Sequence, residues 1–260
     1  MHKFQLLSDI HLEMTRSYPK PQVLAPNLIL AGDIGKLESN IWRQFINFCS
    51  ANWEKVFYVF GNHEFYHSNK TLLQLKTEYA QYFNQFSNIH LLDNSSYSFD
   101  GLDIYGFVGW TKSPFATQRL AQESINDYNY IADDKGNLIT PKYVTRLAQD
   151  GIEKFKSWLG SRANSTPILV ITHFPPICEN TSNPIYLAEP RIVNQYFSWE
   201  NLIKSDAIVH NQIHTWISGH THWSYDFINS ETGIRYVSNQ IGYRSEITES
   251  RFNPDLVIEI

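Results

Sequence analysis

The 260-residue sequence is poor in cysteine, in basic charge and in long apolar runs, and each shortage excludes a class of protein. Its two cysteines, Cys49 and Cys178, provide neither a disulfide framework nor a cysteine metal site. The 21 basic and 26 acidic residues give a formal net charge of −5 without a long block of like charge. A nucleic-acid partner bound through a basic face is therefore not indicated.

The sequence also lacks a basic start followed by a long apolar stretch, because the first short apolar run already begins at Phe4. We therefore expect neither a signal peptide nor a membrane partner, and a cytoplasmic location is the default expectation. A hydrophobic content of 42% over 260 residues is enough to bury one large core. Because the polar motifs described next are spread along most of the chain, we expect one domain over residues 1–260.

What the sequence does have is a series of short apolar runs, each closed by a polar motif. The runs are too short for helices and rich in branched or aromatic residues, so they predict β-strands. They are Phe4 to Leu7, Leu28 to Ala31, Val56 to Phe60, Ile168 to Ile171, and Trp216 to Ile217. The motifs after them are Asp9-Ile10-His11, Gly32-Asp33, Gly61-Asn62-His63-Glu64, Thr172-His173 and Gly219-His220-Thr221-His222. Ligand sites in open α/β sheets form at the carboxyl ends of strands, so these motifs predict one shared site.

The residue types in these motifs favour a pair of divalent metal ions. Two such ions about 3.5–4 Å apart need a shared ligand, and the carboxylate of Asp33 has two oxygens for that bridge. The remaining candidates divide into one set for each ion. The first set is Asp9, His11 and His222, and the second is Asn62, His173 and His220.

The charge balance of such a site favours a phosphate substrate. Two divalent ions carry four positive charges, and Asp9, Asp33 and a hydroxide cancel only three of them. The ions lower the pKa of bound water towards neutrality, which predicts hydroxide as the nucleophile. His63 follows Asn62 directly, so it could protonate the leaving oxygen or stabilise the transition state. Glu64 either orients His63 or is a solvated residue at the start of the next segment.

These motifs, in this order, resemble those of the calcineurin-like metallophosphoesterase superfamily. Its pattern is Asp-x-His, Gly-Asp, Gly-Asn-His-Asp/Glu, His and Gly-His-x-His, and it is matched from Asp9 to His222. Further segments resemble a bacterial-type phosphohydrolase branch of that superfamily. These are Val108-Gly109-Trp110-Thr111, Ile125-Asn126-Asp127-Tyr128 and Asn239-Gln240-Ile241-Gly242-Tyr243.

The resemblance implies an α/β sandwich of two mixed β-sheets packed face to face and flanked by helices, with a dinuclear centre. It carries over Asp9, His11, Asp33, Asn62, His173, His220 and His222 as metal ligands, and His63 as the catalytic histidine. The sequence departs from the protein Ser/Thr phosphatases, because Gly32-Asp33 continues as Ile34-Gly35-Lys36-Leu37 and lacks their Asp-Arg-Gly. A phosphoprotein substrate is therefore not favoured.

Outside these motifs, the hydrophobic periodicity predicts helices over 38–50 and around 72–83, and another from the N-cap Thr140 to a stop at Gly160. Tyr143, Leu147, Ile152, Phe155 and Leu159 are the expected apolar positions of that last helix. Hairpins are expected over 97–110 and 225–237, and a strand over 256–260. We expect these antiparallel pieces to form a second sheet.

Substrate specificity is expected in two segments without a firm period, near 112–137 and 178–201. The aromatic residues Trp110, Tyr128, Tyr186 and Phe197 either line the substrate pocket or belong to the core. Asn62 and His63 are expected to contact substrate as well. Cys49 is expected in the core, and His67 in a capping or surface position beside the pocket.

The sequence as a whole predicts a metal-dependent phosphohydrolase that cleaves a small phosphodiester or phosphomonoester by attack of metal hydroxide. A mixed Asp, His and Asn ligand set accepts Mn, Fe, Zn, Co or Ni, so the metal is left open. Two alternatives stay open: a nuclease, and a non-catalytic interaction module on the same fold. The sequence does not indicate an oligomeric state.

Overall fold

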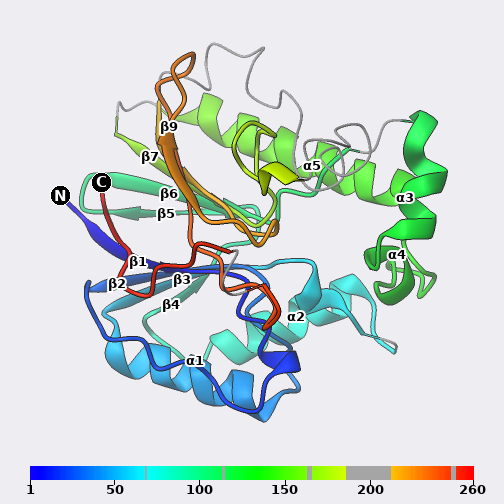
Figure 1. Ribbon diagram of the computed structural model, residues 1–260, viewed down its shortest axis with the longest axis horizontal. Coiled ribbons are helices and arrows are strands. Elements are labelled where there is room, and N and C mark those ends of the chain that lie inside the picture. Colours follow the sequence, from blue (N-terminus) through cyan, green and yellow to red (C-terminus); the bar gives the residue numbers. More distant parts are fainter. Residues whose placement is uncertain (68, 113–114, 163–165, 186–211, 247–249) are drawn as a thin grey trace.

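The computed structural model describes residues 1–67, 69–112, 115–162, 166–185, 212–246 and 250–260. Within them the chain forms two β-sheets packed face to face (Figure 1). The first sheet has the strand order β11-β1-β2-β3-β4. Its strands are β1 (Lys3–Leu7), β2 (Asn27–Ala31), β3 (Lys55–Val59), β4 (Ile89–Leu91) and β11 (Val257–Glu259).

The second sheet has the order β5-β6-β7-β8-β10-β9. Its strands are β5 (Ser95–Phe99), β6 (Leu102–Phe107), β7 (Ile168–Thr172), β8 (Ile213–Ile217), β9 (Tyr225–Ile228) and β10 (Arg235–Ser238). Neighbouring strands from β1 to β4 are parallel, and so are β6, β7, β8 and β10. The antiparallel strands β11, β5 and β9 lie at sheet edges.

Helices cover the outer faces of both sheets. In Figure 1, α1 (Asn40–Asn52) and α2 (Leu72–Phe83) lie below the first sheet, and α5 (Pro141–Ser161) lies above the second. The short elements are α3 (Gln118–Ser124), α4 (Asp127–Tyr130), η1 (Leu12–Met14), η2 (His63–Phe65) and η3 (Phe115–Thr117). Ser39, Thr71 and Thr140 cap the three long helices by accepting a backbone hydrogen bond, which fixes where each helix begins.

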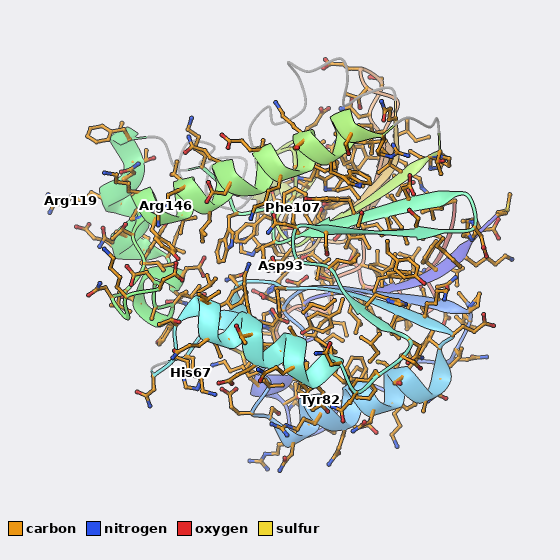
Figure 2. The ribbon with its side chains drawn as sticks, turned by 180° about the vertical axis from the view of Figure 1, so that it is seen from behind. His67, Tyr82, Asp93, Phe107, Arg119 and Arg146 are labelled. Carbon is orange, nitrogen blue, oxygen red and sulfur yellow. The ribbon has the colours of Figure 1, made fainter. Side chains whose placement is uncertain are left out.

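Alternation along the strands builds three hydrophobic layers. In β2, Leu28 and Leu30 face α1 and α2, whereas Ile29 and Ala31 face the other sheet. Both faces are apolar because a parallel sheet in a sandwich is covered on both sides. The third layer lies between the second sheet and α5, where Figure 2 shows Phe107. The Phe107 ring stacks on that of Phe155 at a centroid distance of 5.6 Å.

The strands expected before each polar motif, the helices and the two hairpins are all confirmed, but two details are wrong. The strand near the C-terminus pairs antiparallel with β1 and so belongs to the first sheet, not the second. The buried side of α5 also differs, since Val144, Ala148 and Gly151 face inward while Tyr143, Leu147 and Ile152 are half-buried. Small residues suit that side because aromatic rings such as Phe107 fill the space below it.

The helix α5 continues one residue beyond the expected stop at Gly160, to Ser161. Among the residues that the structure describes, no helix is both long enough and apolar enough to span a bilayer.

Candidate metal centre

The residues expected as ligands all lie just beyond the carboxyl ends of strands. Asp9 and His11 follow β1, Asp33 follows β2, and Asn62 follows β3 in the first sheet. The second sheet contributes His173 after β7, and His220 and His222 after β8. The two sheets are joined at this edge, where the backbone N–H of Ser8 donates to Asn239 O and that of Ile241 donates to Ser8 O. The sandwich therefore brings ligands from both sheets to one place.

An unusual backbone conformation marks these strand ends. Nine non-glycine residues of the described part have a positive φ, and five of them belong to the expected ligand set. Those five are Asp9, His11, Asp33, His220 and His222, with φ between 50° and 75°. The left-handed region costs roughly 1–2 kcal/mol per residue. Five such residues at the strand ends indicate that the surrounding structure holds these turns in place and so sets the direction of their side chains.

Two glycines allow the loops to approach these ligands closely. A Cβ on Gly61 would overlap the carboxylate of Asp33, and a Cβ on Gly219 would overlap Ser8 Oγ and lie 2.6 Å from Asp9 Oδ2. No other residue type fits at either position without moving a ligand, which gives the Gly-Asn-His and Gly-His-x-His motifs a steric reason for their first residue.

The first ligand group contains Asp9, His11 and His222. The Nε2 atoms of His11 and His222 lie 3.0 Å apart, and His222 Nε2 is 3.6 Å from Asp9 Oδ1. Both Asp9 oxygens also accept from the His220 backbone N–H, which fixes the carboxylate. Ligand atoms of the three residues all lie within 4.8 Å of one another, close enough to hold one metal ion.

The second group contains Asn62, His173 and His220. His173 Nε2 lies 3.1 Å from Asn62 Oδ1 and 3.2 Å from His220 Nδ1. Both groups face Asp33, because its Oδ2 is 3.9 Å from His11 Nε2 and 3.4 Å from His173 Nε2. The structure thus brings together all seven residues expected as ligands.

The charges of these groups suit a site for a cation. Burial alone would raise the pKa of Asp33, but the neighbouring His173 and His63 hold it well below the usual range. Burial alone would lower the pKa of His173, but Asp33 outweighs it and raises the pKa to about 10. A metal ion at this place would compete with a proton on His173.

Hydrogen bonds to the atoms of the ligand side chains that face away from the centre turn their metal-binding atoms towards it. His173 Nδ1 lies 3.0 Å from Ala31 O, a carbonyl that can only accept, so the ring carries its proton there and leaves Nε2 free to ligate. Asn62 Nδ2 donates to Asp127 Oδ1 at 2.8 Å, which turns the amide oxygen towards His173. His222 Nδ1 lies 2.5 Å from Glu246 Oε2.

His63 lies between the ligands and the open part of the site. Its Nδ1 is 3.0 Å from Glu13 Oε1, its Nε2 is 3.3 Å from Tyr243 Oη, and its ring stacks on Tyr66 at 4.2 Å. Burial alone would lower its pKa, but Asp33 and Glu13 together raise the pKa to about 9. The imidazole is therefore protonated near neutral pH in the metal-free protein.

Neither reading of Glu64 is correct. Glu64 is 2% exposed, so it is not a solvated residue. It does not orient the His63 ring either, because its carboxylate accepts from the backbone N–H groups of Asp33, Ile34 and Gly61 and from Tyr58 Oη. Glu64 instead holds the loop that carries Asp33, and the carboxylate beside His63 is Glu13.

A cavity of about 440 Å³ opens next to the ligands. It is lined by Asp33, Asn62, His63, His220 and His222, together with Tyr66, Ser124–Asp127, Ser182, Thr221, Tyr243 and Glu246. Trp110 and Tyr128 are each 5% exposed within the core layer below the first sheet, and neither lines the cavity. A substrate contact by these two stays a prediction, and Tyr186 and Phe197 lie outside the described residues.

The sequence reasoning missed the residues that back the ligands. Asp127 and Tyr243 lie within two of the three further segments that resemble the bacterial-type branch, but the resemblance assigns them no role. Glu13 has a readable signal, since polar residues alternate at 9, 11 and 13 around the buried Ile10 and Leu12. Glu246 has no local signal, because a loop brings it to His222 from 24 positions away.

The other notable side chains lie apart from the centre. Cys49 is buried in the core, as expected. His67 has the expected surface role, with Nε2 2.9 Å from Glu38 Oε1.

Comparisons with known proteins agree with this geometry. A sequence model of the family "Calcineurin-like phosphoesterase" matches residues 2–224. An uncharacterized protein of Acanthamoeba polyphaga mimivirus is 29% identical over 276 residues, which cover 100% of this chain and 97% of that one. The crystal structure of phosphopantetheinyl hydrolase from Mycobacterium tuberculosis superposes with a TM-score of 0.65 at 17% identity, covering 96% of this chain and 92% of that one.

The chain therefore belongs to the calcineurin-like phosphoesterase family, which places it among the metal-dependent phosphoester hydrolases. Its candidate divalent-metal ligands are the Asp and His clusters described above.

Proposed function

We propose that this protein is a dinuclear metallophosphoesterase that hydrolyses a small phosphodiester or phosphomonoester. The observation that carries the proposal is the position of Asp33 between two ligand groups. Its Oδ2 lies 3.9 Å from His11 Nε2 on one side and 3.4 Å from His173 Nε2 on the other. A carboxylate placed between two sets of nitrogen and oxygen donors suits a pair of ions.

In this proposal Asp9, His11 and His222 would hold one ion, Asn62, His173 and His220 would hold the other, and Asp33 would serve both. When bound, the two ions supply a hydroxide nucleophile near neutral pH and neutralise the charge of the phosphoryl group. Their identity among Mn, Fe, Zn, Co and Ni is left to measurement, because this donor set suits all five.

The remaining steps belong to side chains of the chain itself. The Nδ1–H of His63 donates to the carboxylate of Glu13, and the Nε2 atom lies on the side of Asp33. A proton held on Nε2 can pass to the leaving oxygen as its bond to phosphorus breaks. Tyr243 Oη, 3.3 Å from Nε2, can hold that nitrogen in line before substrate arrives.

Hydrolysis of a chromogenic phosphodiester beside the matching phosphomonoester, with added Mn²⁺, tests the proposal. We expect turnover that disappears with a chelator and that falls by at least about 100-fold, to a measurable residual rate, in His63→Ala. The substrate that turns over faster identifies the ester class. Absence of turnover on both substrates with two metals demonstrably bound would contradict the proposal and favour the interaction-module alternative.

A further inference from the structure

Glu13 lies where it contacts two histidines at once. It is in η1, two residues after His11, and its side chain is only 11% exposed. Its single oxygen Oε1 is 3.2 Å from His11 Nδ1 and 3.0 Å from His63 Nδ1. These two rings come from different strand ends, after β1 and after β3, and their centroids are 4.5 Å apart.

The chemistry of a carboxylate fixes the protonation of both rings. An ionised carboxylate only accepts hydrogen bonds, so both Nδ1 atoms must carry a hydrogen. Glu13 Oε1 lies within hydrogen-bond distance of both Nδ1 atoms, which is the arrangement of a carboxylate that accepts from two N–H groups.

Both rings consequently present Nε2 on the side away from Glu13. His11 Nε2 and His63 Nε2 each lie 3.9 Å from Asp33 Oδ2. One oxygen thus aims two nitrogens at the same carboxylate, one of them on an expected metal ligand and the other on the expected acid.

Glu64, Asp127 and Glu246, three other carboxylates of this region, make hydrogen bonds to other groups. Glu64 accepts from three backbone N–H groups and Tyr58, and Asp127 Oδ1 accepts from Asn62 and Tyr66. Glu246 lies against His222. Within the described residues, Glu13 is the carboxylate that hydrogen-bonds the His63 ring.

We propose that Glu13 is a positioning residue that couples the first metal group to His63, by holding both Nδ1–H groups on one oxygen. This inference rests on the proposed function, in which His11 is a ligand and His63 is the acid. Removing Glu13 should then affect metal affinity and turnover together, since such outer partners typically contribute about 10- to 100-fold.

The test compares Glu13→Ala and Glu13→Gln with two matched controls. Glu38→Gln removes a Glu–His contact on the surface, because Glu38 Oε1 lies 2.9 Å from His67 Nε2. Glu246→Gln changes a Glu–His contact that involves a metal ligand but not His63. The melting temperature of each variant shows whether it folds.

The first readouts are kcat and KM for the chromogenic diester at saturating Mn²⁺, and Mn²⁺ affinity by competition with a chelator. We expect Glu13→Ala to lower kcat by about 10- to 100-fold with KM changed by less than about threefold, and to weaken Mn²⁺ binding about tenfold. Glu13→Gln, which keeps an acceptor oxygen, should lose less of both. Glu38→Gln should match the wild type.

A double-mutant cycle separates coupling from a merely structural role. If Glu13 acts through His63, Glu13→Ala should cost less than about threefold in a His63→Ala background. Glu246→Gln should cost the same factor in both backgrounds. A Glu13→Ala effect on kcat that is equally large without His63, or absent when His63 is present, would overturn the inference.

A measurement on the metal-free protein needs no activity at all. NMR of ¹⁵N-histidine-labelled protein should show slowly exchanging Nδ1–H protons of His11 and His63, beside that of the buried His173. The first two should disappear in Glu13→Ala and persist in Glu38→Gln, whereas that of His173 should persist in both. If both signals persist in Glu13→Ala, the inference is wrong even if the enzyme is active. If the wild type shows no turnover but both signals depend on Glu13, the proposed function fails while the shared hydrogen bond stands.

Discussion

The two ligand groups on either side of Asp33 differ in how they are supported. In the first group, the far side of the imidazoles is held by carboxylates, Glu13 for His11 and Glu246 for His222. In the second, His173 is held by the backbone carbonyl of Ala31. The two groups are similarly deep, since each has two buried members and one half-buried histidine, His222 in the first and His220 in the second.

In the proposed two-ion centre, this difference would give the two sites unequal character. A ligand held by the backbone of a central strand moves only if the sheet moves, whereas Glu246 lies in a loop and is 36% exposed at its side chain. We therefore expect the second group to bind its ion rigidly and the first to exchange its ion more readily.

Removal of the shared ligand should give the largest effect and eliminate the difference between the two groups. Asp33→Ala leaves both groups without their common oxygen, so we expect loss of both metals and of turnover by at least about 10³-fold, as for other essential groups of a catalytic site. Elemental analysis after gel filtration, together with the diester assay, measures this. A variant with both metals and full turnover would show that Asp33 does not bridge.

Ion exchange should separate the two groups directly. Dialysis of the Mn²⁺-loaded protein against a chelator should remove one ion at least about tenfold faster than the other, since local opening of exposed segments requires less free energy. His222→Ala should abolish the fast phase and His173→Ala the slow one. A single phase in the wild type would mean that the two groups are equivalent.

The stability of the metal-free protein should depend on pH in a direction set by its raised histidines. Folded-state pKa values of about 9 for His63 and about 10 for His173 lie above the unfolded value of 6.5. The resulting stabilisation is full below pH 6.5 and is lost as the pH rises towards 9–10. It amounts to a few kcal/mol for each histidine, at about 1.4 kcal/mol per pKa unit.

Urea titrations of the chelator-treated protein at pH 6.5, 8 and 9 measure this dependence. The metal-loaded protein should show the opposite trend over the same range, because ions bind the deprotonated rings. A metal-free protein that becomes more stable between pH 6.5 and 9 would contradict the charge pairing between Asp33 and these histidines.

The smallest expected effect concerns the second group alone. Tyr66→Phe removes one of two hydrogen bonds to Asp127 Oδ1, at 2.5 Å, and leaves the one from Asn62. We expect about three- to tenfold weaker binding of the slowly exchanging ion, the size of effect of one ordinary hydrogen bond, because the change reaches the ion only through Asp127 and Asn62. Tyr130→Phe, at a ring in contact with Tyr66 but 53% exposed, is the control and should leave both affinities unchanged.

The parts of the centre that the sequence predicts are those encoded locally. Asp33 and His173 each follow a short apolar run, and parallel strands carry such residues to one edge whatever the loops do. A contact between residues that are distant in the sequence gives little sequence signal, as for Glu246. A neighbouring position can also mislead, as for Glu64. The sequence position of Glu64 beside His63 suggests contact, yet its side chain turns back to the Asp33 loop.

The packing of α5 shows the same limit in the core. Hydrophobic periodicity identifies large apolar side chains along a helix. The shape of the sheet that packs against α5 decides which of its residues fit inside. Phe107 of β6 lies against α5, with a ring carbon 3.5 Å from where a Cβ of Gly151 would be, so Ala148 and Gly151 are inside and Tyr143 is only half-buried. The spacing of apolar residues within one segment does not show which distant residues will pack against it.

The joining of both sheets at the ligand edge gives the ions a mechanical role. His11 and His222 are separated by 211 positions along the chain, and Asn62 and His173 by 111. An ion bound by either group closes a loop of that size, much as a covalent cross-link would. Loop closure of this length removes chain entropy on the order of 5 kcal/mol from the unfolded state. Cys49 and Cys178 form no disulfide, so in the proposed centre a bound ion would act as a reversible cross-link between the two halves of the sandwich.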